Sequence, residues 1–282
     1  MDPDRPSATA QKVAIRRAAH QLLDQPCVFS DPLAVTIIGP RASTTLLAAP
    51  GKFQTRSSRF FRAFMAARSR FALDELAAAV DRGVRQFVVL GAGLDTFAYQ
   101  NPYPNLRVFE VDHPATQAWK RERLALTGIP LPDSLTFAPV NFEHQTLDDG
   151  LARAGFQLSE PAFFSWLGVT PYLTRETTLN TLRLIHSLSA HNGVVFDFAI
   201  PRESLSLTYQ FAFDQLAARV SSVGEPFLGF FDPQGICREL ELIGFRSVTL
   251  LDSDAINQRY FHARPDGLKV AGGLANLIGA RG

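Results

Sequence analysis

Apolar runs alternate with helix-like segments along most of this chain. The run FVVL at 87–90 stops at a glycine, and the run VVFDFAI at 194–200 stops at a proline. Short continuous apolar runs of this kind favour parallel strands that are buried on both faces of a sheet. The alternation therefore predicts an α/β fold, with a mostly parallel, doubly wound sheet of about seven strands and an antiparallel last pair. The expected strands are 87–90, 106–111, 135–142, 162–167, 194–200, 246–251 and 273–280.

The length of the chain favours one domain, because 282 residues suffice for a single large core. Residues 1–80 are expected to form an N-terminal helical cover, 81–200 the ligand-binding core, and 232–282 a helix and strand pair. Aromatic residues are concentrated at 201–231, which favours a helical lid over an apolar pocket. The expected helices are 8–23, 31–38 with Asp31 as its N-terminal cap, 60–80, 115–126, 174–188 and 232–242.

A glycine loop follows the first expected strand. Gly91 and Gly93, on either side of Ala92, let the backbone approach a ligand that a Cβ would exclude. Asp112 ends the next strand, where a carboxylate can bind the hydroxyls of a ribose. The third glycine of a dinucleotide loop is missing, and Asp95 would repel a pyrophosphate. Asp95 suits a cofactor that carries an ammonium and a sulfonium, which describes S-adenosylmethionine. A tight turn that binds nothing, or a nicotinamide-dependent oxidoreductase, would be the alternatives.

This loop and several other stretches closely resemble the S-adenosylmethionine-dependent methyltransferases of the leucine carboxyl methyltransferase type, and more closely their bacterial branch. The stretches are AARSRF at 66–71, VVLGAGLDTFAY at 88–99, FEVDHP at 109–114, FFSWLGVTPYL at 163–173 and NQRYF at 257–261. The resemblance covers nearly the whole chain. It implies a Rossmann-like methyltransferase sheet, S-adenosyl-L-methionine as cofactor, and a carboxylate or hydroxyl of a small, apolar metabolite as methyl acceptor.

The resemblance also implies which residues bind the cofactor. Arg68 and Arg17 would bind its carboxylate, with Arg16 as the alternative to Arg17. Asn141, where relatives usually carry Asp, and Phe142 would lie at the adenine. The expected cofactor-binding residues are Arg17, Arg68, Gly91, Ala92, Gly93, Asp95, Asp112, His113, Asn141, Phe142 and Leu167.

Departures from the family pattern leave other functions open. Leu167 stands where some relatives place a Glu that contacts the cofactor, and Phe97 stands where relatives often have Arg. With Asn141, these differences favour, as the alternative, a protein that keeps the fold and binds a ligand or partner without turnover. Protein carboxyl methylation is less favoured, because a protein substrate needs a more extensive recognition surface. Tyr172 and His113 are candidates for a general base, although a structural role is favoured for each.

Composition excludes several further classes. The net charge of +1 gives no electrostatic argument for binding nucleic acid or an anionic membrane. The two cysteines and six scattered histidines do not form a metal-binding pattern, so no metal is expected. No apolar stretch is long enough to span a bilayer, and the N-terminus lacks the features of a signal peptide. We therefore expect a cytoplasmic protein.

Overall fold

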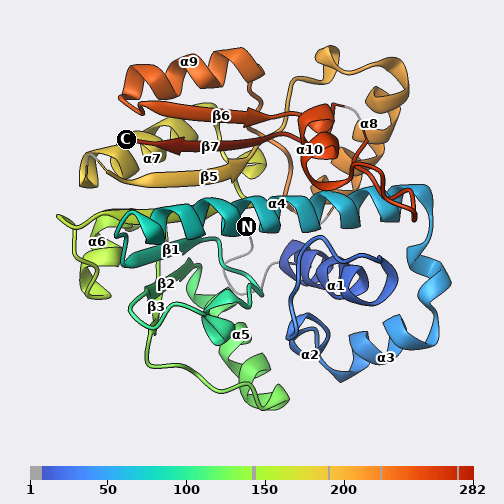
Figure 1. Cartoon of the computed structure of the whole chain (residues 1–282), viewed down its shortest axis with the longest axis horizontal. Coiled ribbons are helices and arrows are strands. Elements are labelled where there is room, and N and C mark those ends of the chain that lie inside the picture. Colours follow the sequence, from blue (N-terminus) through green and yellow to red (C-terminus); the bar gives the residue numbers. More distant parts are fainter. Residues whose placement is uncertain (1–7, 142–143, 190, 223, 272) are drawn as a thin grey trace.

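The computed structural model describes residues 8–141, 144–189, 191–222, 224–271 and 273–282. Within these residues, seven strands form one mixed sheet, as the sequence predicts (Figure 1). Across the sheet the strands lie in the order β3 (Leu135–Pro139), β2 (Arg107–Asp112), β1 (Gln86–Leu90), β4 (Ala162–Trp166), β5 (Gly193–Asp197), β7 (Leu277–Arg281) and β6 (Ser247–Leu251).

Strand direction sets where a ligand can bind. β1 to β5 pair in parallel, whereas β7 pairs antiparallel with both β5 and β6, which confirms the predicted antiparallel last pair. The strand order reverses between β1 and β4, and crevices for ligands open at such a reversal, outside the carboxyl ends of the strands. The loop that begins at Gly91 lies at this position.

Helices cover both faces of the sheet. The long helix α4 crosses one face, and α1 lies against it (Figure 1). The remaining helices lie around the sheet. The helices are α1 (Ala8–Leu23), α2 (Ala34–Ile37), α3 (Pro40–Ala48), α4 (Arg56–Asp81), α5 (Pro114–Thr127), α6 (Leu147–Arg153), α7 (Arg175–Leu188), α8 (Leu207–Ser221), α9 (Pro233–Ile243) and α10 (Ser253–Tyr260). Short 3₁₀ turns are η1 (Pro50–Phe53), η2 (Phe97–Gln100), η3 (Thr170–Tyr172) and η4 (Arg202–Ser204).

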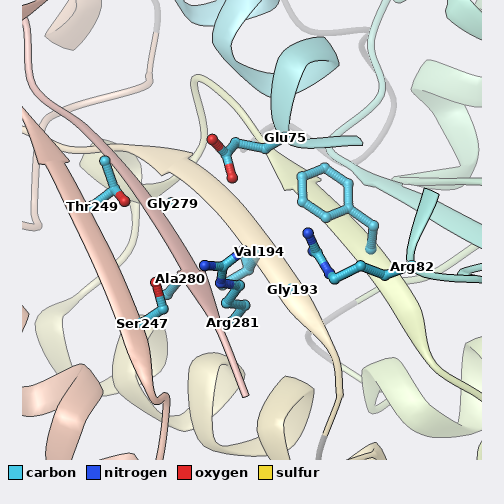
Figure 2. Close-up of a pocket in the computed structure, with 10 residues that line it drawn as sticks. Glu75, Arg82, Gly193, Val194, Ser247, Thr249, Gly279, Ala280 and Arg281 are labelled. Atoms are coloured by element: carbon cyan, nitrogen blue, oxygen red, sulfur yellow. The ribbon is translucent and has the colours of Figure 1, made fainter. Parts of the chain in front are cut away.

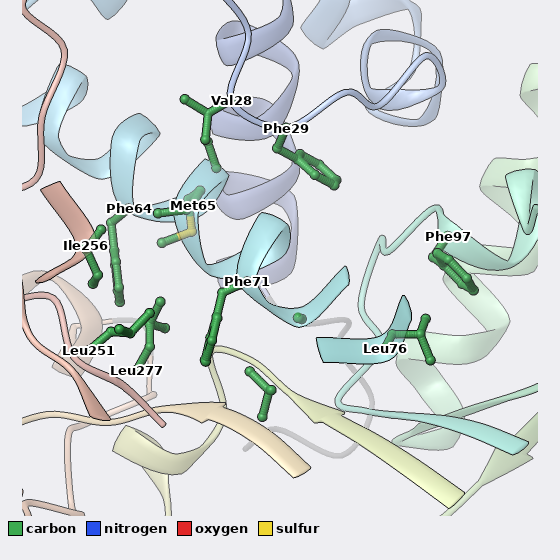
Figure 3. Close-up of a cluster of buried hydrophobic side chains, with 14 of the residues drawn as sticks. Val28, Phe29, Phe64, Met65, Phe71, Leu76, Phe97, Leu251, Ile256 and Leu277 are labelled. Carbon is green, nitrogen blue, oxygen red and sulfur yellow. The ribbon is translucent and has the colours of Figure 1, made fainter. Parts of the chain in front are cut away.

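The local sequence explains the position and length of α4. Thr55 caps its first turn by accepting a hydrogen bond from the Ser58 backbone N–H, at 3.2 Å. Its alanine-rich interior lacks Gly and Pro, so nothing interrupts the helix. Phe71 and Leu76 on its buried face pack into the hydrophobic core shown in Figure 3. α4 is therefore a rigid support for the side chains that it carries.

Several local predictions were wrong. Asp31 does not cap a helix, because α2 has Leu33 as its N-cap and the Asp31 carboxylate instead accepts a hydrogen bond from Arg17. The third strand ends at Pro139 and not at 142, and β7 begins at Leu277 and not at 273. The helices α3, α6 and α10 were not predicted.

Candidate functional site

The glycine loop after β1 requires glycine at two positions. Gly91 and Gly93 have φ values of 67° and 49°, in the left-handed region. A Cβ on Gly91 would lie 2.4 Å from Cγ2 of Val169, and a Cβ on Gly93 would lie 3.1 Å from the Cβ of Ala10. The loop after β4 and the first turn of α1 therefore pack closely on the glycine loop.

Asp112, at the carboxyl end of β2, is fixed against this loop. Its Oδ2 accepts a hydrogen bond from the Gly93 backbone N–H at 2.6 Å, and its Oδ1 accepts one from the His113 N–H at 2.7 Å. Burial raises the pKa of Asp112, and the two backbone hydrogen bonds oppose that shift. Each carboxylate oxygen has a second lone pair, so Asp112 retains capacity to accept hydrogen bonds from a ligand.

Arg17 links α1 to the residues that directly follow the glycine loop, Asp95 and Thr96. Its Nη2 donates to Oδ2 of Asp31 at 2.5 Å and to Oγ1 of Thr96 at 2.8 Å, while its Nη1 lies 3.5 Å from Oδ2 of Asp95. Asp95 also accepts a hydrogen bond from the backbone N–H of Phe97. The positive charge of Arg17 is therefore balanced by two carboxylates of the chain, and its expected contact with the cofactor stays a prediction.

Arg68 points from α4 to the carboxyl ends of β4 and β5. Its Nη1 donates to Oδ2 of Asp197 at 2.8 Å, and Oδ1 of Asp197 accepts a hydrogen bond from the Gly168 N–H at 2.5 Å. Both side chains of this pair are buried. A Cβ on Gly168 would lie 3.0 Å from two Arg68 nitrogens, so glycine at this position makes room for the guanidinium.

Sequence reasoning assigned no role to Asp197. The signal was an acidic residue at the end of an otherwise apolar strand, but its partner lies 129 positions away in the chain. Phe196 is the register partner of Trp166, so Asp197 lies beside Leu167, the position where some relatives carry a carboxylate. The neighbouring strand thus supplies an acidic group that β4 lacks.

A cavity of about 320 Å³ opens next to this ion pair. α1, α4, α8, η3 and the end of β5 line it, and its wall is mostly apolar. The segment 201–231 contributes Phe213 and Phe227 to the wall, and its role as a lid stays a prediction. The other aromatic lining residues are Phe60, Phe61, Phe64, Tyr172 and Phe198.

The two candidate bases lie in different surroundings. Tyr172 lines the cavity, with its ring centroid 5.4 Å from that of Phe227. Burial raises the pKa of Tyr172 to about 12, which keeps the phenol protonated at neutral pH. His113 is the N-cap of α5, and its Nδ1 accepts a hydrogen bond from the Ala115 N–H at 3.3 Å.

The expected adenine contacts are only partly described. The Asn141 backbone N–H donates to Oε1 of Gln145 at 3.1 Å, and Phe142 lies outside the described residues. Leu167 is partly buried against the core on the α4 face of the sheet. The roles expected for these three residues stay predictions.

A second acidic residue of β2 is buried behind the site. Glu110 lies 2.6 Å from Nζ of Lys120, and both side chains are almost completely inaccessible. The Tyr99 hydroxyl lies 3.4 Å from Oε2 of Glu110. Burial raises the pKa of Glu110 to about 7, although the ammonium of Lys120 opposes the shift. This pair was not predicted from the sequence.

Other features of the described residues do not suggest a second site. A cavity of about 120 Å³ lies at the amino ends of the central strands, between Glu75, Arg82 and Arg281 (Figure 2). Ligands of such sheets bind at the opposite edge. Among the residues that the structure describes, no three His, Cys, Asp or Glu side chains gather as metal ligands would, and none of the helices could span a membrane.

Comparisons with known proteins identify relatives of this chain. The family model described as "Leucine carboxyl methyltransferase" matches residues 10–186. A protein of Bacillus subtilis strain 168, named "Putative S-adenosyl-L-methionine-dependent methyltransferase YktD", is 30% identical over 294 residues, which cover 94% of each chain. A similarly named protein of Mycolicibacterium smegmatis is 35% identical over 206 residues, covering 69% of this chain and 66% of its own.

One solved structure has the same fold over nearly its full length. It is described as a "putative methyltransferase" of Thermobifida fusca YX, with a TM-score of 0.57 and 17% sequence identity, and the match covers 99% of this chain and 96% of the other.

Proposed function

Because the chain belongs to the leucine carboxyl methyltransferase family and is an S-adenosyl-L-methionine-dependent methyltransferase, we propose that it methylates an oxygen of a small, largely apolar metabolite. The acceptor atom would be a carboxylate or hydroxyl oxygen. The observation that carries this proposal is the aromatic cavity of about 320 Å³ that opens beside the Arg68–Asp197 pair. Cavities of this size accommodate small molecules, and their apolar walls bury most of the ligand surface.

The chemistry of the residues at the glycine loop fits the cofactor. Asp112 would accept hydrogen bonds from the ribose hydroxyls, since its oxygens have lone pairs beyond those that Gly93 and His113 occupy. Asp95 would repel a pyrophosphate, and the charge of nearby Arg17 is already balanced by Asp95 and Asp31. These contacts favour a cofactor without phosphate.

The buried pair of Arg68 and Asp197 suits the amino-acid end of the cofactor. That end carries one carboxylate and one ammonium, and the pair presents one guanidinium and one carboxylate 2.8 Å apart. Arg68 would bind the cofactor carboxylate through nitrogens other than Nη1, as a planar guanidinium can donate in several directions. Asp197 would accept a hydrogen bond from the ammonium.

Catalysis would then rest on alignment and exclusion of water. When bound, the cofactor supplies a methyl group on a sulfonium, which is electrophilic enough to need no covalent enzyme intermediate. α1, α4 and the segment 201–231 would enclose the acceptor in the cavity and orient its oxygen toward the Arg68–Asp197 pair. A carboxylate acceptor is ionised at neutral pH and needs no base. Tyr172, whose pKa is raised to about 12, would donate a hydrogen bond and not accept a proton.

Calorimetric titration with S-adenosylhomocysteine, with NADH as the comparison ligand, tests the cofactor site. We expect micromolar binding of S-adenosylhomocysteine and none of NADH. Transfer of a labelled methyl group to a panel of carboxylic acids, phenols and alcohols then tests the acceptor class. Absence of S-adenosylhomocysteine binding, or transfer only to nitrogen or sulfur acceptors, would overturn the proposal.

A further inference from the structure

Four cationic side chains line the largely apolar cavity. They are Lys12 and Arg16 of α1, Arg68 of α4 and Arg219 of α8. Among them, Arg68 is balanced by Asp197. Lys12, Arg16 and Arg219 form no ion pair with any of the residues that the structure describes. Within the described part of the chain, three cations of this cavity thus lack an acidic partner; Lys12 and Arg219 are exposed to solvent and Arg16 is partly buried.

Arg16 of α1 and Arg219 of α8 both line this cavity; Arg16 is partly buried and Arg219 is exposed to solvent. The Arg16 guanidinium carbon lies 4.9 Å from the centroid of the Phe61 ring, so its head group is held over the aromatic wall. Burial lowers the pKa of Arg16, and the positive charges of Arg68 and Arg219 lower it further. An anion placed between two guanidiniums relieves the repulsion between their like charges.

One further acidic residue of the described chain, Glu225, lies near this space and has a hydrogen-bond partner. Glu225, whose charge acts on Tyr172, accepts a hydrogen bond from Oγ1 of Thr9. No ion pair joins Glu225 to Arg16 or Arg219 among the contacts of the described residues. Among the described residues, no carboxylate therefore pairs with either guanidinium.

We propose that the cavity binds an amphipathic anion, an alkyl or aryl carboxylic acid, whose anionic group lies between Arg16 and Arg219. The rings of Phe61, Phe213 and Phe227 would cover its apolar part. The inference rests on the proposed function in that the cavity is taken as the acceptor site. It goes further in naming the charge of the ligand and the two residues that recognise it.

The test compares matched carboxylates and alcohols: hexanoate with hexanol, decanoate with decanol, and 4-phenylbutyrate with 4-phenylbutanol. Binding is measured by calorimetry on the full chain saturated with S-adenosylhomocysteine. We expect at least one carboxylate to bind about tenfold or more tightly than its alcohol, because charged hydrogen bonds contribute that much. If no carboxylate binds more tightly than its alcohol, the inference is overturned.

Variants then assign the preference to residues. Arg16→Gln and Arg219→Gln should each remove most of the preference for the carboxylate, leave the affinity for the alcohol unchanged, and leave S-adenosylhomocysteine binding intact. Arg70→Gln is the control, because Arg70 is an exposed arginine of α4 that pairs with Asp74 outside the cavity. A carboxylate preference that survives in both cavity variants would refute the assignment.

Failure of this inference can be told from failure of the proposed function. Loss of S-adenosylhomocysteine binding by the natural chain would count against the proposed function. Normal S-adenosylhomocysteine binding without a carboxylate preference would count against this inference alone. If Arg16→Gln weakened S-adenosylhomocysteine and left the carboxylate unaffected, Arg16 would belong to the cofactor site and the inference would be wrong.

Discussion

Replacing Asp197 by Asn tests how the amino-acid end of the cofactor is bound. The two oxygens of Asp197 contact Nη1 of Arg68 at 2.8 Å and the Gly168 N–H at 2.5 Å. Asn has nearly the same shape and can keep one of these contacts, but it has no charge to offer to an ammonium. The variant therefore separates the charge of the side chain from its volume.

The expected effect follows from the loss of one charged hydrogen bond. Such a bond contributes about 1.5–3 kcal/mol, which corresponds to a weakening of S-adenosylhomocysteine binding by about 10- to 150-fold. 5′-Methylthioadenosine lacks the amino-acid end, so its affinity should change little. The same substitution leaves a buried Arg68 without its anionic partner, and we expect the free energy of unfolding to fall by about 3–5 kcal/mol.

Calorimetry with both ligands, at a temperature where circular dichroism shows the variant to be folded, distinguishes these effects. Asp74→Asn is the matched control, because Asp74 is a partly buried carboxylate that pairs with Arg70 at 2.7 Å on α4, accepts a hydrogen bond from Tyr260, and does not line the cavity. The control should bind both ligands as the natural chain does. Equal weakening of both ligands in Asp197→Asn would show a general disturbance of the site and refute the proposed contact with the ammonium.

Three other substitutions test the ribose site and the buried ion pairs. Asp112→Ala should weaken both S-adenosylhomocysteine and 5′-methylthioadenosine by about tenfold or more, because both carry the ribose; unchanged affinities in calorimetry would refute the ribose assignment. Burial raises the pKa of Glu110 from its usual 4.5 to about 7. Between pH 4.5 and about 7, the folded chain therefore keeps a proton on Glu110 that the unfolded chain has lost. As the pH rises through this window, the free energy of unfolding should fall by up to about 3 kcal/mol relative to that of Glu110→Gln. Denaturant unfolding of the natural chain and of Glu110→Gln at about pH 5 and pH 8 measures this change. The same difference in unfolding free energy between the two proteins at both pH values would contradict the prediction. Asp24→Asn breaks a buried bidentate pair with Arg62, whose nitrogens donate at 2.8 and 2.9 Å; thermal unfolding should show a loss of about 3–5 kcal/mol, and an unchanged melting temperature would argue against it.

The features that the sequence predicts well are those with local causes. The apolar run 87–90 and the glycines that follow it specify a buried strand and a tight loop without reference to the rest of the chain. Asp112 follows in the same way, because a carboxylate at the end of the next parallel strand must lie at the same edge of the sheet. The prediction of a seven-stranded sheet is confirmed for the same reason, since each strand has its own apolar run in the sequence.

The features that the sequence could not predict depend on contacts between distant segments. Asp31 precedes a short helix and is a residue type that often caps helices. Its carboxylate instead accepts hydrogen bonds from the side chains of Arg17 and Thr96. Asp197 offers no sign of its partner, because Arg68 lies on a helix that precedes it by 129 positions. The partner of a buried charged side chain is set by which segments the fold brings together, and a local sequence pattern does not contain that information.

The pair Arg16 and Arg17 shows how one helix can serve both halves of the site. Successive side chains on an α-helix point about 100° apart, so two adjacent arginines cannot reach the same place. Arg17 contacts the glycine-loop side of α1, whereas Arg16 lines the cavity on the other side. The pair of Asp24 with Arg62 fixes the end of α1 against α4, so both arginines are held by one rigid attachment. A shift of α1 along α4 would therefore move Arg17 at the glycine loop and Arg16 in the cavity together, so we expect binding at the two proposed sites to be coupled through this helix.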